Sequence, residues 1–157
     1  NIIGIHIGAA GRWISKSWNP DKIIELIAKL ISEYKIILFA GPEDIEQQNF
    51  ILDSLITDRI IPNDPYNTLR EFFSLVNICD IMITNDSLAL HTATALNKRT
   101  IALFFCTPPW EVEDYELVTK IVSPLFEKYF YSDLYHEDLI NSITAEQVYN
   151  EIKDINL

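Results

Sequence analysis

Two loop-like segments carry the residues best suited to binding chemistry. The first begins at Gly8, opens with small residues and contains two of the chain's twelve cations, Arg12 and Lys16. Small residues allow a backbone to pass close to a ligand, and Arg and Lys pair with phosphate. We therefore expect this loop to approach an anion, with ordinary solvated charges as the alternative. The loop residues in this role are Ala9, Ala10, Arg12 and Lys16.

The second segment reads Asn85-Asp86-Ser87-Leu88-Ala89-Leu90-His91. Asp86 or Ser87 is a typical first cap of a helix. The free N–H groups and the dipole of such a helix start also form an anion site. His91 falls about one turn into this helix, so its ring is within reach of the same region. A role for His91 in packing is the alternative.

Two further strand ends contribute polar groups. Thr107 precedes two prolines and has a hydroxyl that can donate to an anion; a rigid turn alone is the alternative. Glu43 follows Gly41-Pro42 at the end of an apolar run, a position where an acidic residue often meets ribose hydroxyls.

Several catalytic and cofactor motifs are absent. The sequence contains no G-x-x-x-x-G-K-[ST], no G-x-G-x-x-G, no H-E-x-x-H and no nucleophile elbow. The two cysteines have no metal-type spacing, and Cys79 lies in an apolar context typical of a core residue. The sequence thus indicates a binding crevice rather than a catalytic centre, with no metal and no cofactor.

Composition narrows the class of protein. The chain has 157 residues, a net charge of −11, 48% hydrophobic and 22% charged residues. These values fit one folded domain and exclude disorder or a disulfide scaffold. The acidic balance argues against nucleic acid as a partner. No signal-peptide pattern is present, so we expect a reducing, cytoplasmic setting. The chain begins inside an apolar run, which leads us to expect a piece of a longer protein.

Apolar runs of strand length alternate with segments of helical period. Expected strands cover Ile2–Ile7, Lys35–Ala40, Arg59–Ile61, Ile81–Thr84 and Thr100–Phe105, with a sixth candidate over Glu116–Val122. One helix is expected to begin at Asn19-Pro20-Asp21. Four more are expected over Asp44–Leu55, Thr68–Asn77, Leu88–Leu96 and Thr144–Lys153. The aromatic stretch Phe126–Tyr135 has no clear period and is left unassigned.

This alternation predicts an α/β fold, a three-layer, doubly wound parallel sheet of Rossmann-like type. The commonest strand order, 3-2-1-4-5, reverses direction between strands one and four. Ligands bind outside the carboxyl ends of the strands at that reversal. The two loops concerned are those that carry Lys16 and Asp86, so topology and loop chemistry predict the same site.

At these residues the chain resembles the C-terminal half of a family-9 glycosyltransferase, the heptosyltransferases that build the lipopolysaccharide inner core. The resemblance extends from about Ile3 to Trp110. Its motifs, in order, are Gly8-Ala9-Ala10, Ser15-Lys16-Ser17-Trp18-Asn19-Pro20, Phe39-Ala40-Gly41-Pro42-Glu43-Asp44, Asn67-Thr68-Leu69-Arg70-Glu71, the segment Asn85 to His91, and Phe104-Phe105-Cys106-Thr107-Pro108-Pro109.

The resemblance implies a two-domain GT-B enzyme in which residues 1–157 form a single nucleotide-sugar-binding domain. The N-terminal acceptor domain, with the general base, would lie outside this sequence, so the chain alone would be inactive. The donor would be ADP-heptose, transferred with inversion and without metal to a lipopolysaccharide core acceptor. The enzyme would work in the cytoplasm or at the inner face of the inner membrane.

The same resemblance implies roles for individual residues. Lys16 would neutralise the donor phosphates, and Glu43 would lie near the ribose or base. Asp86, Ser87 and Leu88, with His91, would hold the diphosphate at the helix start.

Two departures from the family pattern favour a competing interpretation. Leu88 and Phe105 stand where the family has glycine. The alternative is therefore a non-catalytic α/β nucleotide-binding or interaction domain that has lost donor binding, for which a closed crevice would be the sign. A flavodoxin-like or response-regulator-like domain is a third hypothesis, but Gly8-Ala9-Ala10 offers no acidic cluster at the end of strand one.

Overall fold

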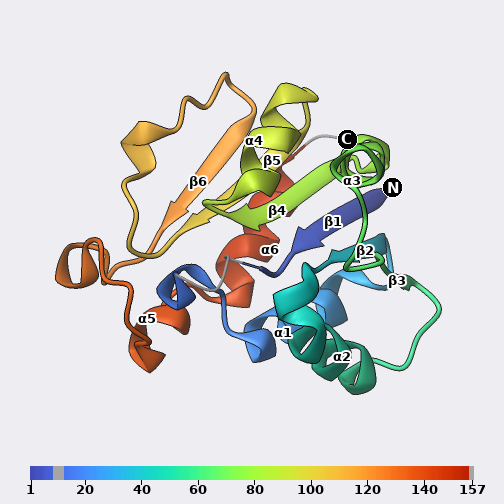
Figure 1. Cartoon of the computed structure of the whole chain (residues 1–157), viewed down its shortest axis with the longest axis horizontal. Helices are drawn as coiled ribbons and strands as arrows, with labels where there is room; N and C mark the ends of the chain where they lie inside the picture. The colour runs from blue at the N-terminus through green and yellow to red at the C-terminus, as the bar shows by residue number, and fades with distance from the viewer. Residues whose placement is uncertain (9–12, 156–157) are drawn as a thin grey trace.

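The computed structural model describes residues 1–8 and 13–155, which form one six-stranded parallel sheet (Figure 1). The strand order is β3-β2-β1-β4-β5-β6. The strands are β1 (Ile2–His6), β2 (Lys35–Phe39), β3 (Ile60–Pro62), β4 (Ile81–Asn85), β5 (Arg99–Phe104) and β6 (Val118–Val122). The predicted fold class, strand order and sixth strand are confirmed.

Side chains alternate between the two faces of the sheet because successive residues of a strand point in opposite directions. On β1, Ile3 and Ile5 are buried in one core cluster. On the opposite face, Phe39 of β2 and Met82 of β4 belong to a second cluster. Burial on both faces explains why the strands are continuous apolar runs.

Helices cover both faces, as Figure 1 shows. The helices α1, α2 and α6 lie on one side of the sheet, and α3 and α4 lie on the other. Their bounds are α1 (Pro20–Leu30), α2 (Ile45–Ser54), α3 (Leu69–Ile78), α4 (Leu88–Ala95), α5 (Glu137–Ile140) and α6 (Ala145–Asp154). The predicted capping boxes form: Thr68 accepts from the Glu71 N–H, and Thr144 accepts from the Gln147 N–H.

The unassigned aromatic stretch contains only a short 3-10 turn, Glu127–Tyr129. It is held by contacts with distant residues: the Tyr131 N–H donates to the Cys106 carbonyl at 2.8 Å, and Tyr129 Oη donates to Asp138 at 2.7 Å. Long-range contacts of this kind leave no periodic pattern, which explains why the stretch gave no prediction.

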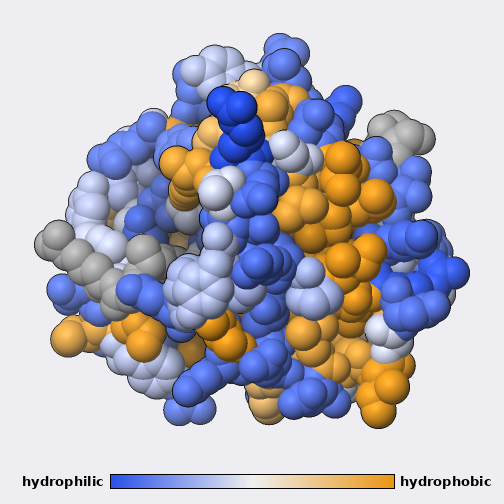
Figure 2. Space-filling model, turned by 45° about the vertical axis from the view of Figure 1, so that its right-hand side comes forward, coloured by the Kyte–Doolittle hydropathy of each residue, from blue (hydrophilic) through white to orange (hydrophobic). Residues whose placement is uncertain are grey.

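One side of the molecule exposes apolar side chains along α3 and the β3 edge. Figure 2 shows apolar atoms gathered on this side. Only Val76 of α3 is buried, whereas Leu69 and Ile78 are 62% and 54% exposed. Phe73 and, on β3, Ile61 are also exposed. We call these four exposed residues, Ile61, Leu69, Phe73 and Ile78, the apolar ridge.

Within residues 1–8 and 13–155, no helix is both long enough and apolar enough to cross a membrane.

Gly4 on β1 provides a test of the packing between the sheet and α3. A Cβ at Gly4 would lie 2.3 Å from Met82 Sδ and 2.8 Å from Cys79 Sγ. Gly4→Ala should therefore lower the free energy of unfolding by about 2 kcal/mol, a typical cost of overpacking a core. Urea unfolding followed by circular dichroism measures the change.

Gly41→Ala is the matched control for this variant. Among the described residues, a Cβ at Gly41 would meet only Asp44 Oδ2, at 3.4 Å, and the backbone there has φ −93°. Its free energy of unfolding should stay within about 0.5 kcal/mol of the wild type, since no overlap arises. Equal losses in the two variants would contradict the packing described for Gly4.

Candidate functional site

The loops that follow β1 and β4 are joined by contacts to Lys16. Its ammonium lies 2.8 Å from Asp86 Oδ2 and 3.4 Å from the Asp86 carbonyl oxygen. Asn85 Nδ2 donates to the Lys16 carbonyl at 2.7 Å. The side chains of Lys16 and Asp86 are only 15% and 21% exposed. Both the backbone and the side chain of Lys16 are thus held by the end of β4, as expected at the reversal point of the sheet.

The short 3-10 turn Ile14–Lys16 is anchored by Ser15, which is fully buried. Ser15 Oγ donates to the Ser132 carbonyl and lies 3.3 Å from Cys106 Sγ. Because the single hydroxyl proton is used on Ser132, the Cys106 thiol is the donor to Ser15 Oγ. Burial raises the pKa of Cys106, so the thiol stays protonated and positions the turn that presents Lys16.

A crevice of about 630 Å³ opens at this junction. The ends of β1, β2 and β4 supply its walls, and Lys16 lies inside it together with the ring of Trp13, 5.4 Å from the ammonium. The crevice is the size of a typical small-molecule site. Its lining comprises His6, Gly8, Trp13, Lys16, Gly41, Pro42, Glu43, Asp44, Asp86, Ser87 and Leu88.

The wall at the end of β2 is acidic. Asp44 Oδ2 accepts the Gly41 N–H at 3.2 Å, and a Cβ at Gly8 would lie 2.2 Å from the same oxygen. Gly8 therefore allows this carboxylate to pack against the end of β1. Burial raises the pKa of Asp44. Glu43 lies beside it in the lining, so this wall presents carboxylate acceptors for hydroxyl groups.

The wall at the end of β4 is the start of α4. Ser87 caps this helix, since its Oγ accepts the Ala89 N–H at 3.3 Å, and it lies 3.0 Å from Thr84 Oγ1. The first helical residue, Leu88, is 54% exposed and lines the crevice. The amino end of α4 thus lies next to Lys16. Among residues 1–8 and 13–155, Lys16 is the cation of the crevice lining, and the helix start adds a positive end.

The remaining predicted residues lie elsewhere. His91 lines a second cavity, between α4 and the segment that joins β5 to β6, rather than the crevice. Thr107 is buried, and its hydroxyl makes no hydrogen bond with any residue of the described part of the chain. Ala9, Ala10 and Arg12 lie outside the described residues.

Comparison with known proteins decides the family. The model of glycosyltransferase family 9 (heptosyltransferase) matches residues 1–130. The chain belongs to glycosyltransferase family 9. The expectation drawn from the ordered motifs is confirmed.

Individual relatives agree with this assignment. The chain is 29% identical over 154 residues to lipopolysaccharide heptosyltransferase 2 of Escherichia coli K12, covering 91% of this chain and 43% of that protein. It is 26% identical over 165 residues to lipooligosaccharide heptosyltransferase 2 of Campylobacter jejuni, covering 99% and 51%. The chain therefore spans about half the length of the curated relatives it matches.

Solved structures show the same fold. The structure of E. coli ADP-heptose lps heptosyltransferase II matches with a TM-score of 0.75 and 28% identity, covering 98% of this chain and 45% of that chain. A family-9 glycosyltransferase from Veillonella parvula also matches with a TM-score of 0.75, at 21% identity over 98% of this chain and 45% of that chain. The doubly wound sheet of this chain thus matches the fold of about half of each of these two proteins.

The two departures from the family-9 pattern lie in different environments. Phe105 is 1% exposed and packs in the core cluster on the α1 and α6 side of the sheet. Its side chain therefore does not enter the crevice. Leu88 does enter the lining. Of the two, only Leu88 reaches the crevice.

Six lining residues of this family-9 chain were not among the predicted site residues: His6, Gly8, Trp13, Gly41, Pro42 and Asp44. His6 ends β1 and Asp44 follows Glu43 by one residue, so the rule that ligands meet strand ends would have found both. Trp13 gave no comparable signal. Its ring position depends on the turn anchored by Ser15.

His6 is the least expected member of the lining. Its Nδ1 is buried without a hydrogen-bond partner in the part of the chain that the structure describes. The ring packs edge-on against Phe72 of α3, with centroids 6.2 Å apart. Burial lowers the pKa of His6 to about 4, so the ring is neutral at pH 7 and offers a hydrogen bond without a charge.

The depressed pKa of His6 predicts a pH-dependent stability. Below pH 6.5 the unfolded histidine takes up a proton, whereas the folded ring stays neutral until about pH 4. The contribution of His6 is therefore fully present above pH 6.5 and is lost as the pH falls toward 4. Between these limits the wild type should lose about 3 kcal/mol more than His6→Gln. Urea unfolding of both proteins across this range measures the difference.

Subtracting the variant curve from the wild-type curve removes the contributions of carboxylates, which titrate in both proteins. A difference that stays constant with pH would contradict the burial described for His6.

Proposed function

We propose that this chain is the C-terminal, donor-binding half of a heptosyltransferase, with the nucleotide sugar held in the crevice between the β1 and β4 loops. Membership of family 9 supports this proposal. Proteins with the same fold have been solved as E. coli heptosyltransferase WaaC with ADP and with ADP-2-deoxy-2-fluoro heptose, at TM-scores of 0.74 and 17% and 18% identity. ADP-heptose is accordingly the proposed donor.

The observation that carries the proposal is the contact between Lys16 and Asp86 at the start of α4. The ammonium lies 2.8 Å from the carboxylate and next to the helix end, and both face the crevice. A diphosphate that binds here forms an ion pair with Lys16, in part replacing the one with Asp86. It also accepts hydrogen bonds from the backbone N–H groups of Ser87 and Leu88. Arg12, with Ala9 and Ala10, belongs to the same loop in the sequence and completes the proposed phosphate side.

The opposite wall suits the nucleoside. Glu43 and Asp44 present carboxylates to ribose hydroxyls. A smaller cavity of about 190 Å³ shares His6 and Leu88 with the crevice and continues toward α3, where Phe72 forms part of its lining. This apolar extension fits a flat base, with the neutral His6 ring at the junction.

In the complete enzyme, the acceptor hydroxyl oxygen attacks the anomeric carbon of the heptose. The new C–O bond forms as the bond from that carbon to the diphosphate oxygen breaks, with inversion, and ADP leaves. Lys16 and the α4 amino end stabilise the charge that develops on the leaving diphosphate. The general base that takes the hydroxyl proton belongs to the N-terminal, acceptor-binding half, so the chain alone turns over no substrate.

The proposed acceptor is the lipopolysaccharide core. Two of the curated relatives are named lipopolysaccharide heptosyltransferase 2, which supports lipopolysaccharide as the acceptor. An enzyme acting on this acceptor works in the cytoplasm at the inner face of the inner membrane. The N-terminal half of the same protein is the proposed structural partner.

The competing hypothesis is a binding module that has lost its donor. A closed crevice was the expected sign of that loss, whereas the crevice is open and holds about 630 Å³. The exposed side chain of Leu88 is the remaining observation in its favour.

Loss of the Lys16 cation should weaken nucleotide binding. Calorimetric titration of the 157-residue chain with ADP, ADP-heptose and a UDP-sugar should show a preference for the adenine ligands. Lys16→Ala should raise the Kd for ADP about tenfold, because a charge-assisted contact to phosphate is lost. Unchanged affinity in this variant, or no affinity of the folded wild type for any nucleotide, would contradict the proposal.

Lys153→Ala is the matched control for charge. Lys153 pairs with Glu33 at 2.8 Å through exposed side chains and does not line the crevice. Its removal changes the net charge by the same amount as Lys16→Ala and should leave the Kd for ADP unchanged.

Leu88→Gly separates the two hypotheses. If the leucine contacts the nucleoside, the variant should raise the Kd for ADP about fivefold, since apolar contact is lost. If the leucine blocks the phosphates, the same change should lower the Kd and so favour the module that has lost its donor. Calorimetry on the folded variant, with circular dichroism as a check on α4, measures the outcome.

A further inference from the structure

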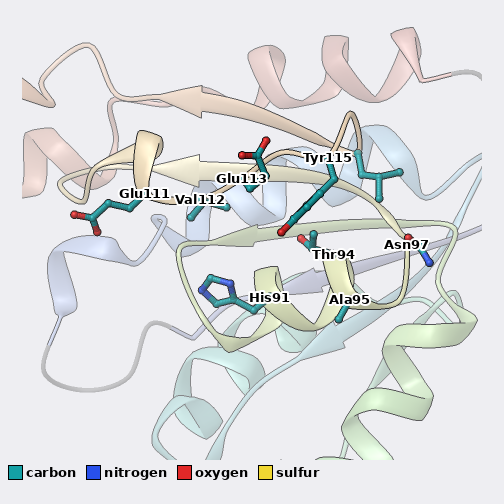
Figure 3. Close-up of a pocket in the computed structure, with 9 residues that line it drawn as sticks. His91, Thr94, Ala95, Asn97, Glu111, Val112, Glu113 and Tyr115 are labelled. Carbon is teal, nitrogen blue, oxygen red and sulfur yellow. The ribbon is translucent and has the colours of Figure 1, made fainter.

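A second cavity, of about 560 Å³, lies between α4 and the segment that joins β5 to β6 (Figure 3). α4 contributes His91 and Thr94, and the joining segment contributes Glu111, Glu113 and Tyr115. Figure 3 shows the Tyr115 ring reaching from this segment toward Thr94. The proposed donor site uses none of these side chains.

The charge of this cavity excludes one class of ligand. Its described lining contains two carboxylates, Glu111 and Glu113, and neither Lys nor Arg. In a chain of net charge −11, such a lining repels phosphates and carboxylates. The crevice, by contrast, holds Lys16. An anionic donor therefore prefers the crevice, and the second cavity is left to a ligand without negative charge.

The polar groups of the cavity match a ligand rich in hydroxyls. The carboxylates of Glu111 and Glu113 accept hydrogen bonds, and the Asn97 amide donates or accepts them. Thr94 Oγ1 donates to the Leu90 carbonyl at 2.9 Å and can accept from a ligand. One oxygen of Glu111 is already used, since Tyr131 Oη donates to Oε1 at 3.0 Å. That bond fixes the carboxylate and leaves Oε2 for a ligand.

One exposed aromatic ring, that of Tyr115, lines the cavity, and a second, that of Trp110, belongs to the residue before the lining residue Glu111. Tyr115 is 65% exposed, and it and Glu116 have φ of 49° and 60°, a conformation that side chains rarely adopt. This bend carries the ring over α4. Next to Glu111, Trp110 is 67% exposed and stacks on Phe130, with centroids 6.1 Å apart and an angle of 23°. Rigid, exposed ring faces suit the C–H face of a sugar ring.

The second cavity lies close to the donor crevice. His91 follows Leu88 by three residues, a rise of about 4.5 Å along the helix. Figure 3 places His91 and Glu111 at the end of the cavity nearest the carboxyl ends of the strands. On the other side, Tyr131, which bonds Glu111, lies with its ring 6.3 Å from that of Trp13 in the crevice lining.

We infer that the cavity between α4 and residues 109–117 binds an uncharged sugar ring of the acceptor. Glu111 and Glu113 accept its hydroxyls, and Tyr115 packs on its apolar face. This inference rests on the proposed function, because the acceptor is a glycan only if the chain belongs to a glycosyltransferase that uses one.

The test is an NMR titration of the isotope-labelled 157-residue chain. The probes are neutral methyl glycosides of glucose, galactose and mannose, and the 6-phosphates of the same three sugars. At least one neutral glycoside should shift the signals of Glu113, Tyr115 and His91, with a Kd of about 10 mM, typical of a single weakly held ring. Its 6-phosphate should bind at least about fivefold more weakly, because of repulsion by the two carboxylates.

Two variants distinguish direct contact from a general disturbance. Tyr115→Ala should raise the Kd for the neutral glycoside about fivefold, through loss of a ring face. Glu113→Gln should reduce the preference for the neutral sugar over its phosphate, a ratio that a merely structural role of Glu113 would not change. Phe50→Ala, which removes a 51% exposed ring on α2, is the matched control and should change neither value.

Three results would overturn the inference: no shifts up to about 100 mM glycoside, shifts confined to the crevice, or equal affinity for the neutral and phosphorylated sugars. ADP titrated into the same sample keeps the two proposals apart. Binding of ADP without glycoside would leave the donor site and remove the sugar site. Binding of glycoside without ADP would leave the sugar site and remove the donor site.

Discussion

The hydrogen bonds and ion pair between Lys16 and the end of β4 join two loops that leave the sheet in opposite directions. After β1 the chain crosses to α1 on one face, and after β4 it crosses to α4 on the other. Loops that diverge in this way leave a gap, and in this protein Asn85 and Asp86 hold Lys16 across it. The pair is mostly buried, so removal of either partner leaves a charge without compensation. This contact lies in the wall of the crevice beside the start of α4.

The location of the site followed from the sequence because it depends on topology. Continuous apolar runs predicted the parallel strands, the caps at Thr68 and Thr144 predicted two helices, and the strand order then placed Lys16 beside Asp86. The direction of His91 could not be predicted in the same way. The helix that carries it is only eight residues long and has buried residues on several sides, Ala89, Leu90, Thr92 and Ala93, so its phase gives no clear outer face. His91 is itself exposed and lines the cavity beside the β5–β6 connection.

The same limit applies to the aromatic stretch after β6. Its backbone is held by the Cys106 carbonyl, which accepts the Tyr131 N–H, and its Tyr129 hydroxyl donates to Asp138. The contact with Cys106 joins residues far apart in the sequence and leaves no local pattern. The aromatic stretch also contacts the candidate site. The hydrogen bond from Ser15 to the Ser132 carbonyl links this stretch to the turn that presents Lys16.

The apolar ridge on α3 and β3 favours association between copies of the chain, whereas the net negative charge of each copy opposes it. Two copies approaching through Ile61, Leu69, Phe73 and Ile78 would bury apolar surface, but each carries a net charge of −11. In dilute buffer their mutual repulsion keeps them apart, whereas at about 0.1 M salt it is screened beyond roughly 10 Å. The colloidal behaviour of this chain is thus set by ionic strength, and low-salt solutions favour separate molecules.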